Sequence, residues 1–270
     1  HSALFAEQWK DSWMDGQFAA AKNMLRQGTT LAKLQEEGII REEVPGVYSI
    51  PTFTREVCDM IIAETDNFIK FSLDHGISIH RPNSMNKYGL VLNLMGMREI
   101  LTDLQQNFFL PLSRIMYPIE GSDFSGHHTF IVSYDCSRDK SLDMHTDDSD
   151  VTWNICLGKE GFAGSGLTFC GQLAAADHRQ LQGHYNHIVG RAVCHLGHQR
   201  HGADVISGGE RHNLIMWCKN EVYRSSELFE KKMRAYEKES GPPNVQCLSY
   251  THDRDYIAFK EYPPGKNPYS

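Results

Sequence analysis

The sequence predicts an α+β protein with a mainly β core, in which helices come first and strands follow. Two observations support this prediction. Apolar residues recur at helical spacing before about residue 120, and from residue 128 onward short β-branched and aromatic runs are separated by Gly, Asp and Asn. Several such runs with turn signals between them are typical of a sandwich or barrel. We therefore expect a β-rich second half supported by helices.

The first part of the chain predicts helices on either side of a short strand. Residues 3–37 are rich in helix-forming residues and predict one or two helices. The apolar positions at helical spacing are Trp9, Trp13, Phe18 and Met24 or Leu25. Residues 46–51 predict a strand that ends at Pro51. A further helix is expected to begin at Thr54, whose hydroxyl can cap the first turn, and to end before Gly76.

A polar loop and a third helix precede the β core. Residues 81–89 are rich in turn-forming residues and predict a loop that leads into a strand at residues 90–92. Within this loop, residues 83–88 have two interpretations, a loop that covers a substrate and a plain connector. Residues 97–116 carry one apolar stripe at helical spacing and predict a helix.

The β core and the C-terminal part complete the expected organisation. The predicted strands are residues 129–134, 151–157, 166–169, 190–196 and 212–217. Residues 225–239 predict a surface helix, and an irregular tail follows it. The expected division is an N-terminal helical extension (1–45), a main domain (46–222) with helical support (46–120) and a β core (121–222), and a C-terminal helix and tail (223–270).

Composition limits the partners and the compartment. The net charge of −7 disfavours a nucleic-acid partner, because a phosphate backbone is bound by clustered cations. No apolar stretch approaches the roughly 20 residues that span a bilayer, and the start of the chain has no signal-peptide core, so we expect no membrane partner. The oligomeric state has no signature in the sequence.

The 7 cysteines are scattered and form no C-x-x-C pair. We therefore expect neither a disulfide framework nor a zinc ribbon, which favours a reducing compartment, the cytoplasm or the nucleus. Those in or beside predicted strands are expected to be small buried side chains: Cys136, Cys156, Cys170, Cys194 and Cys218.

The chemistry-bearing motif is His145-Thr146-Asp147, followed by a distal histidine and an arginine. In a strand, residues two apart face the same side, so His145 and Asp147 can both face a barrel interior. Two imidazoles and one carboxylate occupy one face of an octahedral iron(II) and leave positions open for a co-substrate and O2. Arg211 suits the far carboxylate of a dicarboxylic acid. Metal site and anion anchor together indicate 2-oxoglutarate.

Three histidines compete for the distal position. Strand alternation places His195 and His201 on one face and His198 on the other. The step from His201 to Arg211 crosses a Gly-Gly turn that can bring the guanidinium beside the metal, which selects His201. The other two histidines are then expected to hold polar contacts within the structure.

Other polar and aromatic residues near this motif have structural interpretations. H-x-D alone is a weak signal in a chain with 14 histidines. An acidic run predicts a solvated rim, with attraction of a cationic substrate as the alternative; its members are Asp139, Asp143, Asp148 and Asp150. Trp153 and Trp217 are expected in barrel packing.

The longer pattern around the motif is more specific than the triad. It consists of SYDCSRDKSLDMHTDDSDVTWNICLGKEGFAGSGLTFCG and GRAVCHLGHQRHGADVISGGERHNLIMWC, with a weaker similarity in RPNSMNKYGLVLN. This pattern resembles the Fe(II)/2-oxoglutarate-dependent oxygenase superfamily, in its prolyl/lysyl-hydroxylase-like branch, the 2-oxoglutarate and iron-dependent oxygenase domain-containing proteins. The resemblance implies iron ligation by His145, Asp147 and His201, and a salt bridge from Arg211 to the distal carboxylate of 2-oxoglutarate.

The resemblance also implies a fold and further co-substrate contacts. Tyr134 matches a tyrosine that hydrogen-bonds 2-oxoglutarate, Leu167 matches an apolar residue beside it, and Asn154 matches a polar strand residue that faces the pocket. The implied fold is a double-stranded β-helix, a distorted jelly roll, with helices packed on its outside.

The implied activity is hydroxylation of an unactivated C–H bond, with Lys or Pro side chains of a protein or peptide as substrates. Iron(II), 2-oxoglutarate and O2 are the implied cofactors, succinate and CO2 are released, and ascorbate is expected to be stimulatory. One alternative keeps the cofactors and changes the target to a small metabolite or a nucleic-acid base. Others are a non-catalytic module that binds 2-oxoglutarate or metal, and a cupin-like zinc or manganese protein that would need no Arg211.

Overall fold

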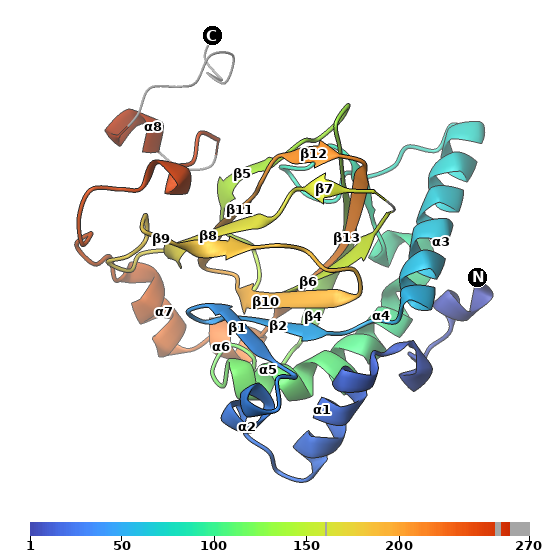
Figure 1. The fold of residues 1–270 in the computed structure, drawn as a ribbon, viewed down its shortest axis with the longest axis horizontal. Coiled ribbons are helices and arrows are strands. Elements are labelled where there is room, and N and C mark those ends of the chain that lie inside the picture. The colour runs from blue at the N-terminus through green and yellow to red at the C-terminus, as the bar shows by residue number, and fades with distance from the viewer. Residues whose placement is uncertain (160, 252–254, 260–270) are drawn as a thin grey trace.

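The computed structural model describes residues 1–159, 161–251 and 255–259, and its centre is a pair of facing antiparallel sheets (Figure 1). The large sheet has the order β1-β2-β10-β6-β13-β4-β3, with the bounds Arg41–Val44, Val47–Pro51, Arg191–Leu196, Val151–Gly158, Glu210–Lys219, Gly126–Asp135 and Gly89–Val91. The small sheet has the order β5-β11-β8-β9, with the bounds Leu142–His145, Gln199–Ala203, Leu167–Gln172 and Leu181–Tyr185. A two-stranded ribbon pairs β7 (Ala163–Gly164) with β12 (Ile206–Gly208).

Helices cover the face of the large sheet that points away from the small sheet (Figure 1). They are α1 (Gly16–Arg26), α2 (Leu31–Glu36), α3 (Arg55–Asp74), α4 (Arg98–Leu104) and α5 (Leu110–Met116), with π-helical segments at Asn93–Met97 and Gln105–Phe109. The predicted start of α3 is confirmed, because the Thr54 hydroxyl accepts a hydrogen bond from the amide of Val57 at 3.4 Å. The predicted end is confirmed as well, since Gly76 follows the helix in the left-handed region with φ +65°.

The prediction of one or two helices over residues 3–37 is only partly right. Two short 3₁₀ turns, Ser2–Phe5 and Asp11–Trp13, precede α1 and α2. Met14 pairs with Phe53 as an isolated bridge, and Asp15 caps α1 by accepting from the amide of Gln17 at 2.8 Å. The chain is therefore extended where a continuous helix would otherwise cross residues 14 and 15.

Two hydrophobic cores follow from the alternation of side chains in the large sheet. On the helix side, Trp153 stacks on Phe109 with ring centroids 4.1 Å apart, and Trp9, Trp13 and Phe18 belong to the same cluster. The other core lies between the sheets and contains Phe130, Val132, Tyr134 and Ile215 from the large sheet and Leu167, Phe169 and Ala203 from the small one. The space between the sheets is thus where inward-facing polar residues meet.

The C-terminal segment wraps along the small sheet after α6 (Glu221–Arg224) and α7 (Glu227–Arg234). The surface helix predicted to reach residue 239 ends at Arg234, because the amide of Glu237 instead donates to the carbonyl of Ala174 at 2.9 Å. A 3₁₀ turn (Val245–Cys247) and α8 (Asp255–Ala258) follow. Part of the predicted irregular tail, residues 260–270, lies outside the described residues.

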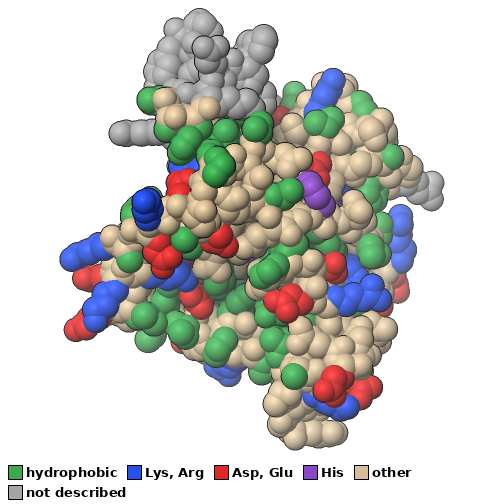
Figure 2. Space-filling model, turned by 60° about the vertical axis from the view of Figure 1, so that its left-hand side comes forward, with side chains coloured by type: hydrophobic (Ala, Val, Ile, Leu, Met, Phe, Trp, Pro, Cys, Tyr) green, Lys and Arg blue, Asp and Glu red, His purple; other side chains and the backbone are tan. Residues whose placement is uncertain are grey.

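Charges of both signs are interspersed on one face of the molecule. On the face shown in Figure 2, acidic and basic side chains lie beside one another, and the coloured residues form no continuous basic patch. Helix α7 is an example, with ion pairs Lys231–Glu227 at 3.6 Å and Arg234–Glu230 at 3.4 Å. In the part of the chain that the structure describes, no helix combines the length and apolarity needed to cross a bilayer.

The structure departs from the expectations for two cysteines, Cys170, which is buried but not a free thiol, and Cys136, which is not buried. Cys170 in β8 forms a disulfide with Cys247, which lies 77 residues further along the chain. Sequence spacing does not reveal this pair, because the C-terminal segment reaches β8 only through the tertiary fold. Cys136 is exposed rather than buried, since it follows β4 in a turn.

Alkylation of the denatured, unreduced protein should modify five cysteines, and reduction first should raise this number to seven. Because the disulfide closes a long loop, Cys247→Ser should lower the free energy of unfolding by about 4 kcal/mol. Cys136→Ser is the control, since it removes an exposed free thiol. Seven alkylated cysteines without reduction would contradict the pairing.

Candidate metal centre and anion pocket

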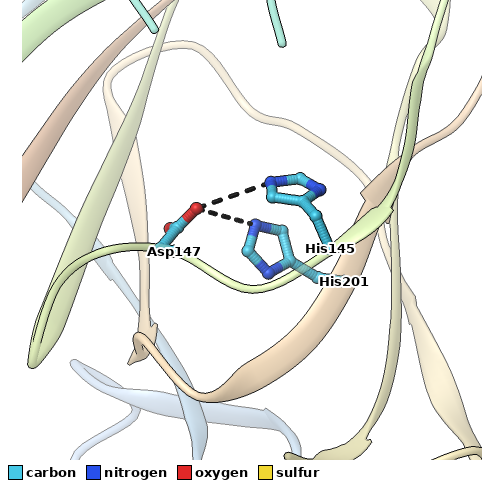
Figure 3. A group of neighbouring side chains, drawn as sticks. All are labelled: His145, Asp147 and His201. Carbon is cyan, nitrogen blue, oxygen red and sulfur yellow. Dashed lines mark ion pairs between the residues drawn. The ribbon is translucent and has the colours of Figure 1, made fainter. Parts of the chain in front are cut away.

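Three ligand-type side chains converge between the sheets, as Figure 3 shows. His145 is the last residue of β5 and pairs in register with His201 of β11, so both rings leave the small sheet at the same level. The Nε2 atoms of His145 and His201 lie 3.4 and 3.7 Å from Asp147 Oδ1. One ligand atom from each residue lies within 4.8 Å of the others, and all three residues are buried.

Asp147 reaches this position by a route that differs from the prediction. It lies two residues beyond β5 rather than within the strand, and its amide donates to the carbonyl of Gly197 at 2.9 Å. Gly197 belongs to the turn between β10 and β11. This turn, rather than strand alternation, therefore fixes the backbone that carries the carboxylate.

The hydrogen bonds of the two rings fix their tautomers. His145 Nδ1 lies 2.8 Å from the carbonyl of Asp143, and His201 Nδ1 lies 2.9 Å from the carbonyl of Gln199. A carbonyl only accepts, so each Nδ1 carries the hydrogen and each Nε2 lone pair faces Asp147. The polarity of both rings is thus the one that a metal ligand requires.

The protonation states suit a divalent cation as well. Burial, with the neighbouring ring of His145, lowers the pKa of His201 to about 3. Burial alone would raise the pKa of Asp147, but the imidazoles of His201 and His145 hold it below its usual range. A neutral imidazole and an ionised carboxylate are the forms that bind a metal. Two histidines and one carboxylate with open positions are typical of non-haem iron(II).

Thr152 and His195 complete the surroundings of Asp147. The Thr152 hydroxyl donates to Asp147 Oδ2 at 2.7 Å, which leaves Oδ1 to face His145 and His201. His195 is fully buried, and its Nε2 lies 3.8 Å from Asp147 Oδ2. The alternation argument for His195 and His201 was wrong, because they lie on strands of different sheets. Their rings are 4.4 Å apart because the sheets face each other. His198 faces Phe229 of α7 instead.

Thr152→Val should weaken metal binding by about tenfold to a hundredfold, because losing a partner that orients a metal ligand has effects of this size. The measurement is calorimetric titration with Mn(II), and the unfolding temperature provides the folding control. Thr102→Val, on the distant helix α4, is the matched substitution and should bind Mn(II) as the unaltered protein does. Equal affinities of the two variants would remove Thr152 from this role.

The three residues line a pocket between the sheets. All residues that the sequence singled out for the site line this pocket: Tyr134, His145, Asp147, Asn154, Leu167, His201 and Arg211. Arg211 lies on β13 after the predicted Gly208-Gly209 turn and pairs in register with Tyr134 of β4. The structure therefore brings the candidate metal-ligand set, His145, Asp147 and His201, and the arginine into one cavity.

Arg211 is a buried cation that is short of partners. It is 1% exposed, and its Nε and Nη1 atoms have no hydrogen-bond partner among the described residues. Its guanidinium lies over the Tyr134 ring, 4.8 Å from the centroid. Burial lowers the pKa of Arg211, but a guanidinium keeps its charge in proteins even so. Burial also raises the pKa of Tyr134, so the phenol stays protonated. A buried, unpaired guanidinium is costly unless an anion completes it.

Sequence reasoning missed several residues of this pocket. Asn213 lies two residues after Arg211 on the same face of β13. Its side-chain NH2 group donates to Asn154 Oδ1 at 2.5 Å. Strand alternation would have found it. The loop of residues 83–88, for which the sequence allowed two interpretations, contributes three side chains to the pocket lining: Asn83, Met85 and Asn86. Of the two tryptophans expected in packing, Trp153 is fully buried in the core, whereas Trp217 lines the pocket.

The acidic run does not form the predicted solvated rim. Asp150 is buried and pairs with Arg224 at 2.9 Å, and the exposed Asp148 pairs with the same guanidinium at 3.2 Å. Asp143 accepts from a backbone amide of the C-terminal segment at 2.6 Å, and Asp139 accepts from an amide of the polar loop before β3 at 2.7 Å. The four carboxylates hold chain segments in place.

Comparisons with known proteins point to one family. An OGFOD2-like domain model matches residues 7–122. The chain is 35% identical over 196 residues to the 2-oxoglutarate and iron-dependent oxygenase domain-containing protein ICU11 of Arabidopsis thaliana, an alignment that covers 70% of this chain and 49% of that protein. It is 35% identical over 182 residues to the human 2-oxoglutarate and iron-dependent oxygenase domain-containing protein 2, covering 67% and 51%. The chain thus spans about half the length of these curated relatives.

The fold is similar to that of a solved prolyl hydroxylase from Trichoplax adhaerens, in complex with a peptide fragment of the hypoxia inducible factor oxygen degradation domain. The TM-score is 0.50 at 14% sequence identity, and the match covers 82% of this chain and 99% of the other. At this identity the likeness concerns the fold alone.

Proposed function

The chain belongs to the 2-oxoglutarate and iron-dependent oxygenase domain-containing proteins, and from this premise we propose that it is an iron(II)- and 2-oxoglutarate-dependent dioxygenase. The reaction is hydroxylation of an unactivated C–H bond at the expense of O2, with conversion of 2-oxoglutarate to succinate and CO2.

The observation that carries this proposal is the incomplete hydrogen bonding of Arg211 inside the pocket of the metal-ligand set. A buried guanidinium with free N–H groups fits a carboxylate with two parallel hydrogen bonds. A cupin-like zinc or manganese protein would have no use for such a cation. A dicarboxylic 2-oxo acid accounts for both features, because one end chelates a metal and the other is a carboxylate.

The residues of the chain bind and orient the reactants. His145, Asp147 and His201 would hold iron(II), which supplies the oxidation chemistry when it is bound. Arg211 would bind the distal carboxylate, and the hydroxyl of Tyr134 would donate a hydrogen bond to the same ligand. Leu167 and Asn154 would line the co-substrate site, and the apolar walls between the sheets would exclude water from it.

The proposed substrate is a Lys or Pro side chain of a protein or peptide. The similarity in fold to a prolyl hydroxylase that binds a peptide supports this choice. Apolar side chains of the pocket, among them Met85, Leu142 and Trp217, suit the aliphatic part of such a residue.

We further propose that the two sheets constitute a double-stranded β-helix. The strand orders of the large and small sheets support this assignment. In this view residues 46–222 are the oxygenase domain, residues 1–45 are its helical extension and residues 223–270 are its C-terminal helix and tail.

The test is 2-oxoglutarate turnover with a panel of peptides, metabolites and oligonucleotides. The purified protein is incubated with iron(II), ascorbate, 2-oxoglutarate and O2, and succinate release and the gain of one oxygen atom are measured by mass spectrometry. We expect iron-dependent succinate release and an oxygenated lysyl or prolyl peptide. Oxygenation of only metabolites or bases would change the substrate class. Absence of turnover with every compound would contradict the enzyme assignment.

A further inference from the structure

The loop before β3 is connected to Tyr134 by a chain of hydrogen bonds with a fixed direction. Asn83 Oδ1 accepts from the backbone amides of Met85 at 2.8 Å and Asn86 at 2.7 Å. Backbone amides only donate, so the oxygen of Asn83 must face them and its NH2 group must face away. This NH2 group donates to Asn86 Oδ1 at 3.0 Å, which in turn directs the Asn86 NH2 group to the phenol oxygen of Tyr134 at 3.1 Å.

The direction of these hydrogen bonds determines whether the Tyr134 hydroxyl acts as a donor or an acceptor toward the pocket. The Tyr134 oxygen accepts from Asn86, and its own hydrogen finds no acceptor in that NH2 group. Both residues are at least nine-tenths buried and both line the pocket. The hydroxyl hydrogen is therefore left to donate into the cavity, on the wall where the ring of Tyr134 contacts Arg211.

The loop before β3 is also held in place by contacts that do not belong to this series of hydrogen bonds. Asp139 Oδ2 accepts from the amides of Lys87 and Tyr88 at 2.7 and 3.2 Å, and the carbonyl of Pro82 lies 2.9 Å from Nε2 of His128. These contacts hold both ends of the loop while its middle faces the pocket. Such a fixed arrangement presents a donor without rearrangement when an anion binds.

We infer that Asn83 and Asn86 are positioning residues that make the Tyr134 hydroxyl a hydrogen-bond donor to a carboxylate ligand held by Arg211. This inference rests on the proposed function and extends it to the loop whose role the sequence left open. The two asparagines contact Tyr134 rather than the reacting atoms, and they act by setting the direction of one hydroxyl group.

Asn86→Asp separates this role from a structural one. The aspartate has the size and shape of asparagine, keeps the hydrogen bond from Asn83, and accepts one from Tyr134. Every heavy-atom contact is retained, but the phenol hydrogen now points to residue 86 and away from the pocket. Asn86→Ala removes the contacts and leaves the hydroxyl free to rotate toward a ligand. If Asn86 positions the hydroxyl group, Asn86→Asp should weaken 2-oxoglutarate binding more than Asn86→Ala does. If its role is purely structural, Asn86→Ala should weaken binding more.

The measurement is calorimetric binding of 2-oxoglutarate to the Mn(II)-loaded protein, with unfolding temperatures for each variant. We expect Asn86→Asp to weaken binding by about tenfold to a hundredfold, as for the loss of a hydrogen bond to a charged group. Asn86→Ala should weaken it less, although it lowers the unfolding temperature more. Ser84→Ala, an exposed residue of the same loop, is the control and should bind as the unaltered protein does.

A double-mutant cycle with Tyr134→Phe separates the effect of the added charge of Asn86→Asp from its effect on the Tyr134 hydroxyl group. Without the hydroxyl, Asn86→Asp acts only through its charge, and we expect its effect to shrink to about threefold or less. Unchanged affinity of Asn86→Asp, or an effect that persists undiminished in Tyr134→Phe, would overturn the inference. If the unaltered protein itself fails to bind 2-oxoglutarate, the proposed function has failed instead.

Discussion

Asp147→Ala is expected to reduce 2-oxoglutarate turnover by at least about a thousandfold while the protein remains folded. In the proposed site Asp147 supplies the anionic metal ligand, and the Nε2 atoms of His145 and His201 both lie near its Oδ1 atom. Open catalytic metal sites contribute less to folding than closed structural ones, so the unfolding temperature should change little. Succinate release in the presence of iron(II) is the measurement.

The neighbouring residue provides the matched control. Asp148 is exposed and pairs with Lys219 and Arg224 at the surface, so Asp148→Ala removes the same side chain one position away from the centre. This variant should keep its turnover, since surface ion pairs contribute little to stability. Succinate release by Asp147→Ala at the level of Asp148→Ala would remove Asp147 from the ligand set.

Arg211→Ala should weaken 2-oxoglutarate binding by about a hundredfold to a few thousandfold, because truncating one partner of a buried charge pair typically costs about 3–5 kcal/mol. Binding is measured by calorimetry on the Mn(II)-loaded protein. The ligand-free protein should not lose stability in the same proportion, because Arg211 is buried there with unpaired N–H groups. The rise in unfolding temperature that 2-oxoglutarate produces should therefore disappear in the variant.

Two further comparisons make this prediction specific. Arg211→Lys keeps a positive charge but loses the planar fork, so its affinity should fall between those of Arg211→Ala and the unaltered protein. A shorter 2-oxo acid without the distal carboxylate should bind Arg211→Ala about as well as it binds the unaltered protein. Undiminished affinity of Arg211→Ala for 2-oxoglutarate would make the arginine a structural residue.

The large sheet and most helices were predictable because their side chains repeat with the periods of strands and helices. The strands around Ile131, Trp153 and Leu214 are long, apolar and alternating, and Thr54 and Gly76 mark the ends of α3. Strand β9 was missed because it reads LQGHY, a polar run that pairs with β8 only through the tertiary fold.

The candidate site was predictable in its composition but not in its geometry. The distal histidine was predicted as His201 from its spacing to the Gly-Gly turn and to Arg211. The register that sets His201 opposite His145 depends on the pairing of β5 with β11, and the contact of Asn86 with Tyr134 joins residues 48 positions apart. No local pattern encodes such contacts, and the same holds for the Cys170–Cys247 disulfide.

The most direct test of the account is an anaerobic titration with iron(II) and 2-oxoglutarate, followed by visible absorption. A 2-oxo acid that chelates iron(II) at the His145, Asp147 and His201 set should give a metal-to-ligand charge-transfer band that saturates at one iron per chain. The band should be absent in Asp147→Ala and require higher 2-oxoglutarate concentrations in Arg211→Ala. A protein that binds iron(II) but gives no such band at saturating 2-oxoglutarate would contradict chelation of the 2-oxo acid at this site.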